Sequence, residues 1–284
     1  MPPRTVGFVG LGNMGSALAA NLVAAGHELV THDVAGPGRS PAGATFVDDL
    51  GELARRAPIV VLSLPDGRGS AAVAGALASA PDRVVTHVVD TSTVGLAAAR
   101  SVGEHLAGAG VAYVDAPVSG GVAGAMTRTL TVMYAADPAA CAAVQPVIEG
   151  LSDRRFHVGD RPGMAQALKL ANNFLSATAL AATSEAVAFA ASVGLDMATV
   201  LEVLNASSGR SAATSDKFVH HVLTGSYSSG FANTLMAKDL DLYLEAIGSR
   251  PGPIGKVTAE IWRRFATAEP GVDFTRIHPF VEGS

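Results

Sequence analysis

Three glycines stand close together after the first apolar run of the chain. Gly10, Gly12 and Gly15 form the pattern G-x-G-x-x-G directly after the β-branched run 5–10 and directly before an apolar segment with helical period, and Asp33 ends the next β-branched run. In this arrangement the glycines make a tight turn and let the backbone approach a pyrophosphate, while the helix amino terminus attracts the phosphates. The pattern predicts a dinucleotide-binding site, and the alternative is a glycine turn with a structural role only.

Asp33 bears on which dinucleotide would bind. Its carboxylate could accept hydrogen bonds from both ribose hydroxyls, whereas a 2′-phosphate would face its negative charge. This favours NAD over NADP. Arg39, in the loop that follows, could swing toward a phosphate, so NADP remains open.

A serine and two glycines follow a later apolar run, in "DAPVSGG" at 115–121. Ser119 offers a hydroxyl, and Gly120 and Gly121 offer backbone N–H groups, a combination suited to binding a carboxylate. The alternative is an ordinary loop between strands.

One lysine lies in an otherwise uncharged segment, since Lys169 is the only charge between Arg161 and Glu185. With Gln166 and Asn173 it falls on one face of a helix, in a polar stripe that also takes in Asn172 and Ser176. A solvated surface stripe normally carries several charges, so we favour a mostly buried helix whose polar stripe faces a cavity. Burial would lower the pKa of the lysine toward the range useful for proton transfer. Asn173, one turn later, could hold the substrate or the lysine.

The elements that must position these residues follow from the hydrophobic pattern. Short β-branched runs alternate with alanine-rich helical stretches in the first half of the chain, which predicts βαβ units and a doubly wound, mostly parallel sheet. The runs are 5–10, 27–33, 58–65, 83–93, 111–118, 130–136 and 154–159. A ligand should lie beyond the carboxyl ends of these strands.

The pattern changes to helices alone after Gly163. The first helix should end at Gly194, and Asp196 should cap the next one. We therefore expect an α/β fold made of a Rossmann domain over residues 1–162 and an all-helical substrate and dimerisation domain over residues 163–284, joined by a long helix.

Composition narrows the class of protein. The 284 residues are 49% hydrophobic and 16% charged, no segment reaches the ~18 uninterrupted apolar residues of a membrane span, and a net charge of −5 without a Lys/Arg cluster gives no footprint for nucleic acid. The histidines are scattered, which predicts neither a metal cluster nor a catalytic triad. With one cysteine, Cys141, and no secretory signal before the first run, we expect a cytoplasmic protein whose partner is a small molecule or another copy of itself.

Several stretches in fixed order resemble the β-hydroxyacid dehydrogenase family, which includes 3-hydroxyisobutyrate dehydrogenase and tartronate semialdehyde reductase. The matching stretches are 7–22, "LP" at 64–65, "DTST" at 90–93, 115–121 with "GA" at 124–125, "GMAQALKLANN" at 163–173, "FANTLMAKDLDL" at 231–242 and "DF" at 273–274. The resemblance implies an NAD-dependent oxidoreductase that interconverts a short β-hydroxy acid and its semialdehyde or keto acid, in a homodimer or homotetramer.

The resemblance also implies roles for single residues. The family's catalytic lysine falls on Lys169, its helix-mate asparagine on Asn173, and its substrate-carboxylate loop on Ser119, Gly120 and Gly121. The implied cofactor contacts are Gly10, Leu11, Gly12, Asn13, Met14, Gly15, Asp33, Leu64, Pro65, Thr93 and Lys238. Two alternatives keep the fold: an imine reductase, which generally has another residue at the position of Lys169, and a catalytically silent dinucleotide-binding protein.

Two positions depart from the family's pattern. Arg128 stands where the family has glycine after the serine loop, and "AAD" at 135–137 replaces the usual pair of glycines. Arg128 could reach the site and select a second acidic group on the substrate, but we favour a surface role for it.

Overall fold

The computed structural model describes residues 5–250 and 252–283, and the chain forms two compact units, residues 1–169 and 170–284. Each unit is considered by itself below. The assignment of separate cofactor and substrate roles to domains divided at residue 162 stays a prediction.

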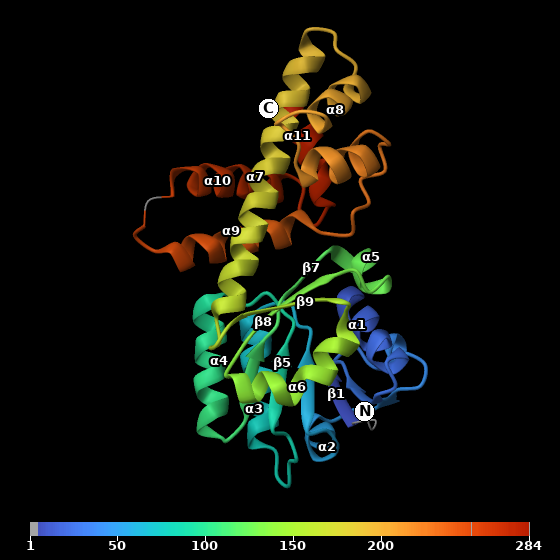
Figure 1. Cartoon of the computed structure of the whole chain (residues 1–284), viewed down its shortest axis with the longest axis vertical. Helices are drawn as coiled ribbons and strands as arrows, with labels where there is room; N and C mark the ends of the chain where they lie inside the picture. The colour runs from blue at the N-terminus through green and yellow to red at the C-terminus, as the bar shows by residue number, and fades with distance from the viewer. Residues whose placement is uncertain (1–4, 251, 284) are drawn as a thin grey trace. The chain divides into compact units, whose positions relative to one another are not determined.

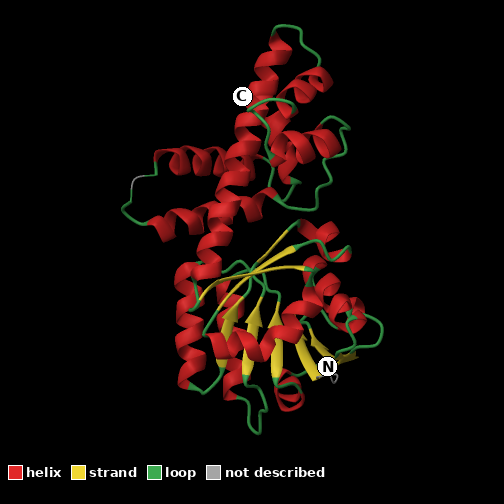
Figure 2. Ribbon diagram, in the orientation of Figure 1, coloured by secondary structure: helices red, strands yellow, loops and turns green. Residues whose placement is uncertain are grey.

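The first unit is built on one sheet with strand order β3-β2-β1-β4-β5-β6-β8-β7, and β9 pairs with β8 (Figures 1 and 2). From β3 to β6 every neighbouring pair is parallel, whereas β8 runs antiparallel to β6 and β7. The strands are β1 Thr5–Val9, β2 Glu28–His32, β3 Thr45–Phe46, β4 Ile59–Leu62, β5 His87–Asp90, β6 Ala112–Asp115, β7 Val118–Ser119, β8 Thr131–Ala135 and β9 Arg154–Gly159. The expected doubly wound, mostly parallel sheet is confirmed.

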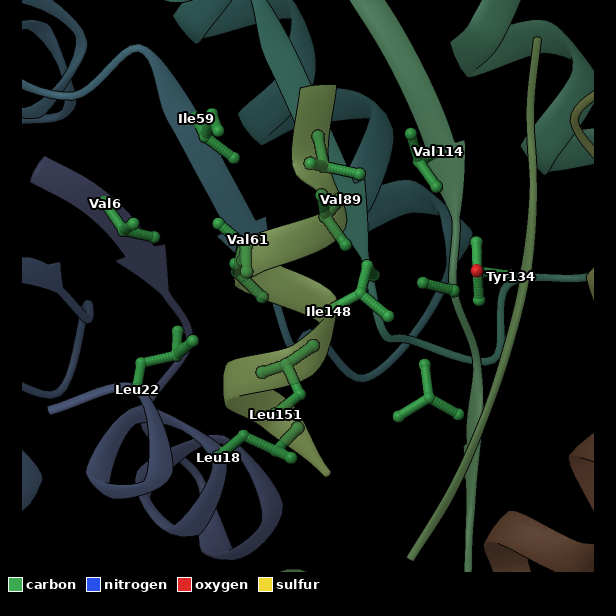
Figure 3. Packing of buried hydrophobic residues seen from close by; sticks show 14 of the residues in the cluster. Val6, Leu18, Leu22, Ile59, Val61, Val89, Val114, Tyr134, Ile148 and Leu151 are labelled. Atoms are coloured by element: carbon green, nitrogen blue, oxygen red, sulfur yellow. The ribbon is translucent and has the colours of Figure 1, made fainter. Parts of the chain in front are cut away.

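Helices cover both faces of this sheet. They are α1 Asn13–Ala24, α2 Leu50–Arg56, α3 Gly67–Ser79, α4 Leu96–Gly108, α5 Gly121–Met126 and α6 Pro138–Leu151, with a 3₁₀ turn η1 Pro37–Arg39. All four residues of β4 are buried: Ile59 and Val61 pack with α1 and α6, while Val60 and Leu62 pack with α2, α3 and α4. Figure 3 shows Leu18 of α1 and Ile148 and Leu151 of α6, which belong to one cluster with the strand residues Ile59, Val61 and Val89. Burial on both faces explains why the strand runs are continuously β-branched.

Two strands were not expected from the sequence. β3 and β7 are two residues long each, too short to show any alternation of apolar and polar residues. The strand predicted over 83–93 is shorter in the structure. Only His87–Asp90 pairs with neighbouring strands, and the residues after Asp90 form a loop.

The second unit is helical, as expected (yellow to red in Figure 1). Its elements are α7 Met164–Ser192, whose first six residues belong to the first unit, α8 Met197–Asn205, a π-helix η2 Ala213–Val222, α9 Asn233–Ile247, α10 Pro253–Ala268, a 3₁₀ turn η3 Phe274–Arg276 and α11 Ile277–Glu282. Gly194 follows α7 with φ of +88°, and Asp196 accepts a hydrogen bond from the N–H of Thr199. Both expected caps are therefore confirmed.

The core of the second unit is aromatic. Trp262, Phe265 and Phe218 have no exposed surface, and the indole of Trp262 donates a hydrogen bond of 3.2 Å to the carbonyl of Ala177 in α7. Helix α7 is long and apolar enough to cross a membrane by length and composition alone, a test that a core helix of a soluble protein also passes.

Candidate active site

The glycine turn between β1 and α1 leaves no room for side chains. Gly10 has φ of +95°, and a Cβ on it would lie 2.3 Å from the carbonyl oxygen of Ser63, while a Cβ on Gly15 would lie 1.9 Å from the carbonyl oxygen of Gly10. Helix α1 then begins at Asn13, and no side chain caps its amino terminus. A bare helix end behind a glycine turn fits the phosphates of a dinucleotide.

Asp33 and Arg39 both border this turn. The carboxylate of Asp33 accepts hydrogen bonds from the N–H of Leu11, at 2.5 Å, and of Ala35, at 2.7 Å. Arg39 donates to the side-chain oxygen of Asn13 at 2.7 Å. The acidic residue thus lies beside the glycines as expected, and Arg39 is close enough to the same turn to contribute to cofactor choice.

The remaining cofactor candidates of the first unit lie in loops after β4 and β5. Leu64 and Pro65 follow β4, Thr93 follows β5, and the N–H of Leu64 donates 2.8 Å to the hydroxyl of Ser92, which joins the two loops. These loops and the glycine turn all leave the carboxyl ends of adjacent parallel strands, where ligands bind in doubly wound sheets.

The loop with Ser119 depends on its two glycines. Gly120 has φ of +129° and Gly121 has φ of +68°, and a Cβ on Gly120 would lie 3.2 Å from the Cα of Leu130. Helix α5 begins at Gly121 without a side-chain cap. The loop therefore presents a hydroxyl and backbone N–H groups together, as a carboxylate site requires.

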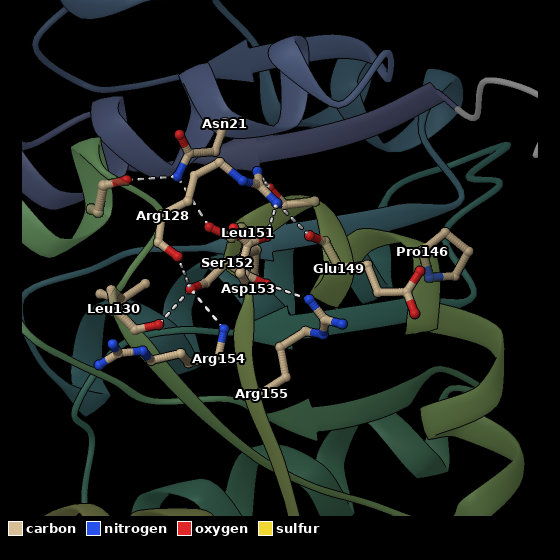
Figure 4. Close-up of polar contacts among 12 residues, drawn as sticks. Asn21, Arg128, Leu130, Pro146, Glu149, Leu151, Ser152, Asp153, Arg154 and Arg155 are labelled. Atoms are coloured by element: carbon tan, nitrogen blue, oxygen red, sulfur yellow. Dashed lines mark hydrogen bonds and ion pairs between the residues drawn. The ribbon is translucent and has the colours of Figure 1, made fainter.

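The contacts of Arg128 stabilise the fold and do not serve the binding of a ligand at this loop. Its guanidinium donates 2.7 Å to the carbonyl of Gly150 and 2.9 Å to that of Glu149, and pairs with Asp153 at 2.9 Å (Figure 4). A cation at the carboxyl end of α6 donates hydrogen bonds to carbonyl groups that the helix leaves unpaired, and it interacts favourably with the negative end of the helix dipole. These contacts support the surface role favoured above. Its φ of +58° explains why glycine would also suit this position.

Lys169 and Asn173 lie one turn apart on α7. Lys169 is 7% exposed and Asn173 is 5% exposed, whereas Leu168 and Leu175, on other faces of the helix, are 45% and 65% exposed. Gln166, Lys169 and Asn173 thus lie on the buried face of α7. The predicted stripe was too wide, because Asn172 is exposed and Ser176 is half-buried. An amphipathic surface helix would show the opposite arrangement.

In the second unit, Asp239 joins two of the candidate residues. Its carboxylate accepts 2.6 Å from the side-chain N–H of Asn173 and lies 3.3 Å from the ammonium of Lys238. Asp239 was not among the site residues singled out from the sequence. Its exposure of 3% was not foreseen, although the adjacent Lys-Asp pair was a signal of it.

Two buried acids of the first unit were missed as functional candidates. Asp90 and Asp115 end the neighbouring strands β5 and β6, stand opposite each other in register and have no exposed surface. Burial raises the pKa of Asp115 to about 7, and it also raises the pKa of Asp90, to which Tyr113 donates at 3.1 Å. The sequence signal was an aspartate at the end of each apolar run.

Comparison with known proteins matches both halves of the chain. Residues 5–159 match the model of the NAD-binding domain of 6-phosphogluconate dehydrogenase, and residues 163–280 match the model described as NAD-binding of NADP-dependent 3-hydroxyisobutyrate dehydrogenase. The chain is 33% identical to the 3-hydroxyisobutyrate dehydrogenase of Pseudomonas aeruginosa over 297 aligned residues, 98% of either chain. It is also 33% identical to the 2-(hydroxymethyl)glutarate dehydrogenase of Eubacterium barkeri over 268 residues, 90% of this chain and 87% of that one. Among solved structures, the Mycobacterium tuberculosis 3-hydroxyisobutyrate dehydrogenase with L-serine is 30% identical, with a TM-score of 0.91 over 98% of this chain and 99% of that one.

Proposed function

The chain belongs to the β-hydroxyacid dehydrogenase family, and on that premise we propose that it oxidises a short β-hydroxy acid with NAD and that Lys169 is its general acid–base. Its class, an NAD(P)-dependent 3-hydroxyacid dehydrogenase, follows from the matches themselves. The proposal adds the preferred cofactor, the residue that moves the proton and the group that binds the carboxylate. The observation that carries it is the burial of Lys169, the single charge in the first half of α7.

The glycine turn fits the cofactor's pyrophosphate, with Gly10 and Gly15 giving the close approach and α1 its uncapped amino terminus. Bound NAD would supply the hydride acceptor. Asp33, already fixed by the N–H groups of Leu11 and Ala35, would take the ribose hydroxyls and disfavour a 2′-phosphate.

The acid's carboxylate is assigned to Ser119, Gly120 and Gly121. Their hydroxyl and N–H groups are the donors that an anion needs, and the two glycines, both with positive φ, carry no side chain of their own over the backbone. Relatives are named for different hydroxy acids, which indicates that residues outside this loop recognise the rest of the substrate. The substrate class is therefore a β-hydroxy acid with one carboxylate at this loop.

Lys169 would accept the proton of the substrate hydroxyl as C3 loses its hydride, and would donate a proton to the carbonyl oxygen in the reverse reaction. Asn173 has its amide oriented by Asp239. In this scheme Asn173 fixes the geometry of the substrate hydroxyl beside the lysine, one helical turn away.

Self-association is proposed through the second unit. Leu175 and Phe189 of α7 and Ile254 and Val257 of α10 are 60% to 72% exposed, and a hollow of about 340 Å³ between the two helices is lined mainly by apolar side chains. Exposed apolar groups of this size on neighbouring helices are typical of an interface. We expect a homodimer or homotetramer. We also place the enzyme in the cytoplasm, where a lone thiol such as that of Cys141 is ordinary, and fractionation of the source cells tests this.

The test is a substrate panel with two variants. Parent, Lys169→Ala and Lys256→Ala proteins are given 3-hydroxyisobutyrate, D-glycerate, serine or 3-hydroxypropionate with NAD or NADP, and reduced cofactor is followed by absorbance. Lys256 is an exposed lysine of α10 and serves as the matched control. Loss of the general base should lower kcat by about 10²- to 10⁴-fold for Lys169→Ala only.

Four results would contradict parts of the proposal. Equal rates of parent and Lys169→Ala with the best acid would remove the lysine from the mechanism. Equal rates with NAD and NADP at low cofactor would remove the preference assigned to Asp33. A second assay gives the parent reduced cofactor with a cyclic imine or a semialdehyde, and faster turnover of the imine would make the protein an imine reductase. Cofactor binding without any turnover would make it a silent binding protein.

A further inference from the structure

The side chain of Gln166, in the first turn of α7, is fully buried and uses both its amide atoms. Its oxygen accepts hydrogen bonds of 3.0 and 3.2 Å from the N–H groups of Val94 and Gly95, and its nitrogen donates 3.0 Å to the carbonyl of Ser92. One residue thus binds the backbone of the loop 92–95 at three points. That loop follows β5 and contains Thr93, one of the cofactor candidates.

Asp115 holds the same turn of α7 from a second strand. One carboxylate oxygen accepts 3.0 Å hydrogen bonds from the N–H groups of both Gly163 and Gln166. Asp115 ends β6, which pairs in parallel with β5, so the first turn of α7 is tied to two adjacent strands. The contact of Leu64 with Ser92 extends the same network to the loop after β4.

This capping arrangement differs from that of other helices in the chain. Helices α2, α3, α6 and α8 are each capped by the aspartate that directly precedes them, namely Asp49, Asp66, Asp137 and Asp196. A cap from the adjacent residue stabilises a helix wherever the helix lies. A cap from Asp115, 48 residues before Gly163, also fixes where α7 begins relative to the sheet.

From these contacts we infer that Gln166 and Asp115 are positioning residues, which together hold the start of α7 so that Lys169 stands at a fixed place relative to the loop 92–95. This inference rests on the proposed role of Lys169. Lys169 is three residues after Gln166, within one turn of a rigid helix, so the placement of its Cα follows that of Gln166. The flexible lysine stem needs such an anchor, because proton transfer requires the reacting atoms at hydrogen-bond distance.

The first variant to test is Gln166→Met, which keeps the length of the side chain and removes all three hydrogen bonds to the loop. A small displacement of the acid–base group should lower kcat by about 10- to 100-fold. The KM for the acid should change by less than about 3-fold, because its carboxylate is assigned to residues 119–121, and the deuterium isotope effect on kcat should rise as hydride transfer becomes limiting. Gln145→Met, on α6, is the matched control, since Gln145 bonds only to side chains, those of Glu149 and Tyr134, in the described contacts.

A conservative pair of variants at Asp115 separates positioning from general loss of structure. Asp115→Ala removes the acceptor and should lower kcat by about 10-fold or more. Asp115→Asn keeps an oxygen for the two N–H groups and should recover most of that loss. Equal kcat values for these two variants would contradict the inference, as would an unchanged kcat or a parallel change in the KM for the acid in Gln166→Met.

Hydrogen exchange of the parent protein tests the contacts without any turnover. The amides of Val94, Gly95, Gly163 and Gln166 should exchange slowly, and those of Val94 and Gly95 should lose about 10-fold or more of their protection in Gln166→Met, because each loses its only acceptor described here. Fast exchange of these four amides in the parent would overturn the inference by itself. A parent that oxidises no hydroxy acid would instead refute the proposed function, and the exchange rates would still show whether the start of α7 is held.

Discussion

Replacing Asp115 by asparagine should change how the stability of the protein depends on pH. Burial raises the pKa of Asp115 from 3.8 to about 7, the nearby charge of Asp90 raises it further, and the N–H groups of Gln166 and Gly163 oppose the rise. Within the described residues, the second carboxylate oxygen has no hydrogen-bond partner. An ionised carboxylate with one bare oxygen in the interior is costly, so the folded protein favours the protonated acid.

The direction in which Asp115 changes stability with pH follows from its pKa values in the unfolded and the folded protein, 3.8 and about 7. The folded state holds the proton of Asp115 more tightly than the unfolded state, so the stability this carboxyl contributes is fully present below about pH 3.8 and is lost as the pH rises through about 7. The rise in pKa corresponds to about 4 kcal/mol of unfolding free energy. Asparagine does not ionise and keeps one acceptor for both N–H groups. The unfolding free energy of Asp115→Asn minus that of the parent should therefore increase by about 4 kcal/mol between about pH 4 and pH 8.

Urea denaturation followed by circular dichroism, at several pH values and one ionic strength, measures this difference. Asp137→Asn is the control, because Asp137 is an exposed acid that also accepts a hydrogen bond from a helix N–H. Its replacement removes the same charge and likewise keeps an oxygen for the helix N–H, without removing a buried carboxyl. Curves of parent and Asp115→Asn that run parallel across the whole pH range would refute the assignment of a raised pKa to Asp115.

Two further predictions concern surfaces of the molecule. Arg128→Met should lower the unfolding free energy, measured by urea denaturation, by about 1 to 3 kcal/mol because the contacts to α6 are lost, and kcat should not change. Arg128→Gly should recover about 1 kcal/mol of this loss, because the φ of +58° at this position suits glycine. A methionine variant as stable as the parent would show that these contacts contribute nothing. Phe189→Asp should convert the parent oligomer to smaller species in light scattering, while Val34→Asp, at a position of the first unit that is 99% exposed, should not; a monomeric parent would exclude the proposed interface.

The fold was predictable because its signals are local. The strand runs are continuously apolar since both faces of the sheet are covered. Gly15 is needed because it lies against Gly10 in the same turn, whereas Gly10 is needed because it lies against Ser63 after β4, so here the local glycine pattern marks a contact that is distant in the sequence. Helix ends at Gly194 and Asp196 follow from residues within one turn. The two-residue strands β3 and β7 were missed because they form only by pairing with strands elsewhere in the sequence.

The residues of the candidate site stay a prediction from the sequence, and the contacts that support them could not be predicted from it. Periodicity put Gln166 on the same helix face as Lys169, and buried amides almost always have partners, so burial of that face already implied that Gln166 bonds to something. Its partners are 71 to 74 residues away in the sequence, and those of Asp115 are 48 and 51 residues away, distances over which a one-dimensional pattern holds no information. A buried polar residue one turn from a candidate acid–base group is therefore worth treating as part of the site from the outset, because the contacts that satisfy it also fix where that group stands.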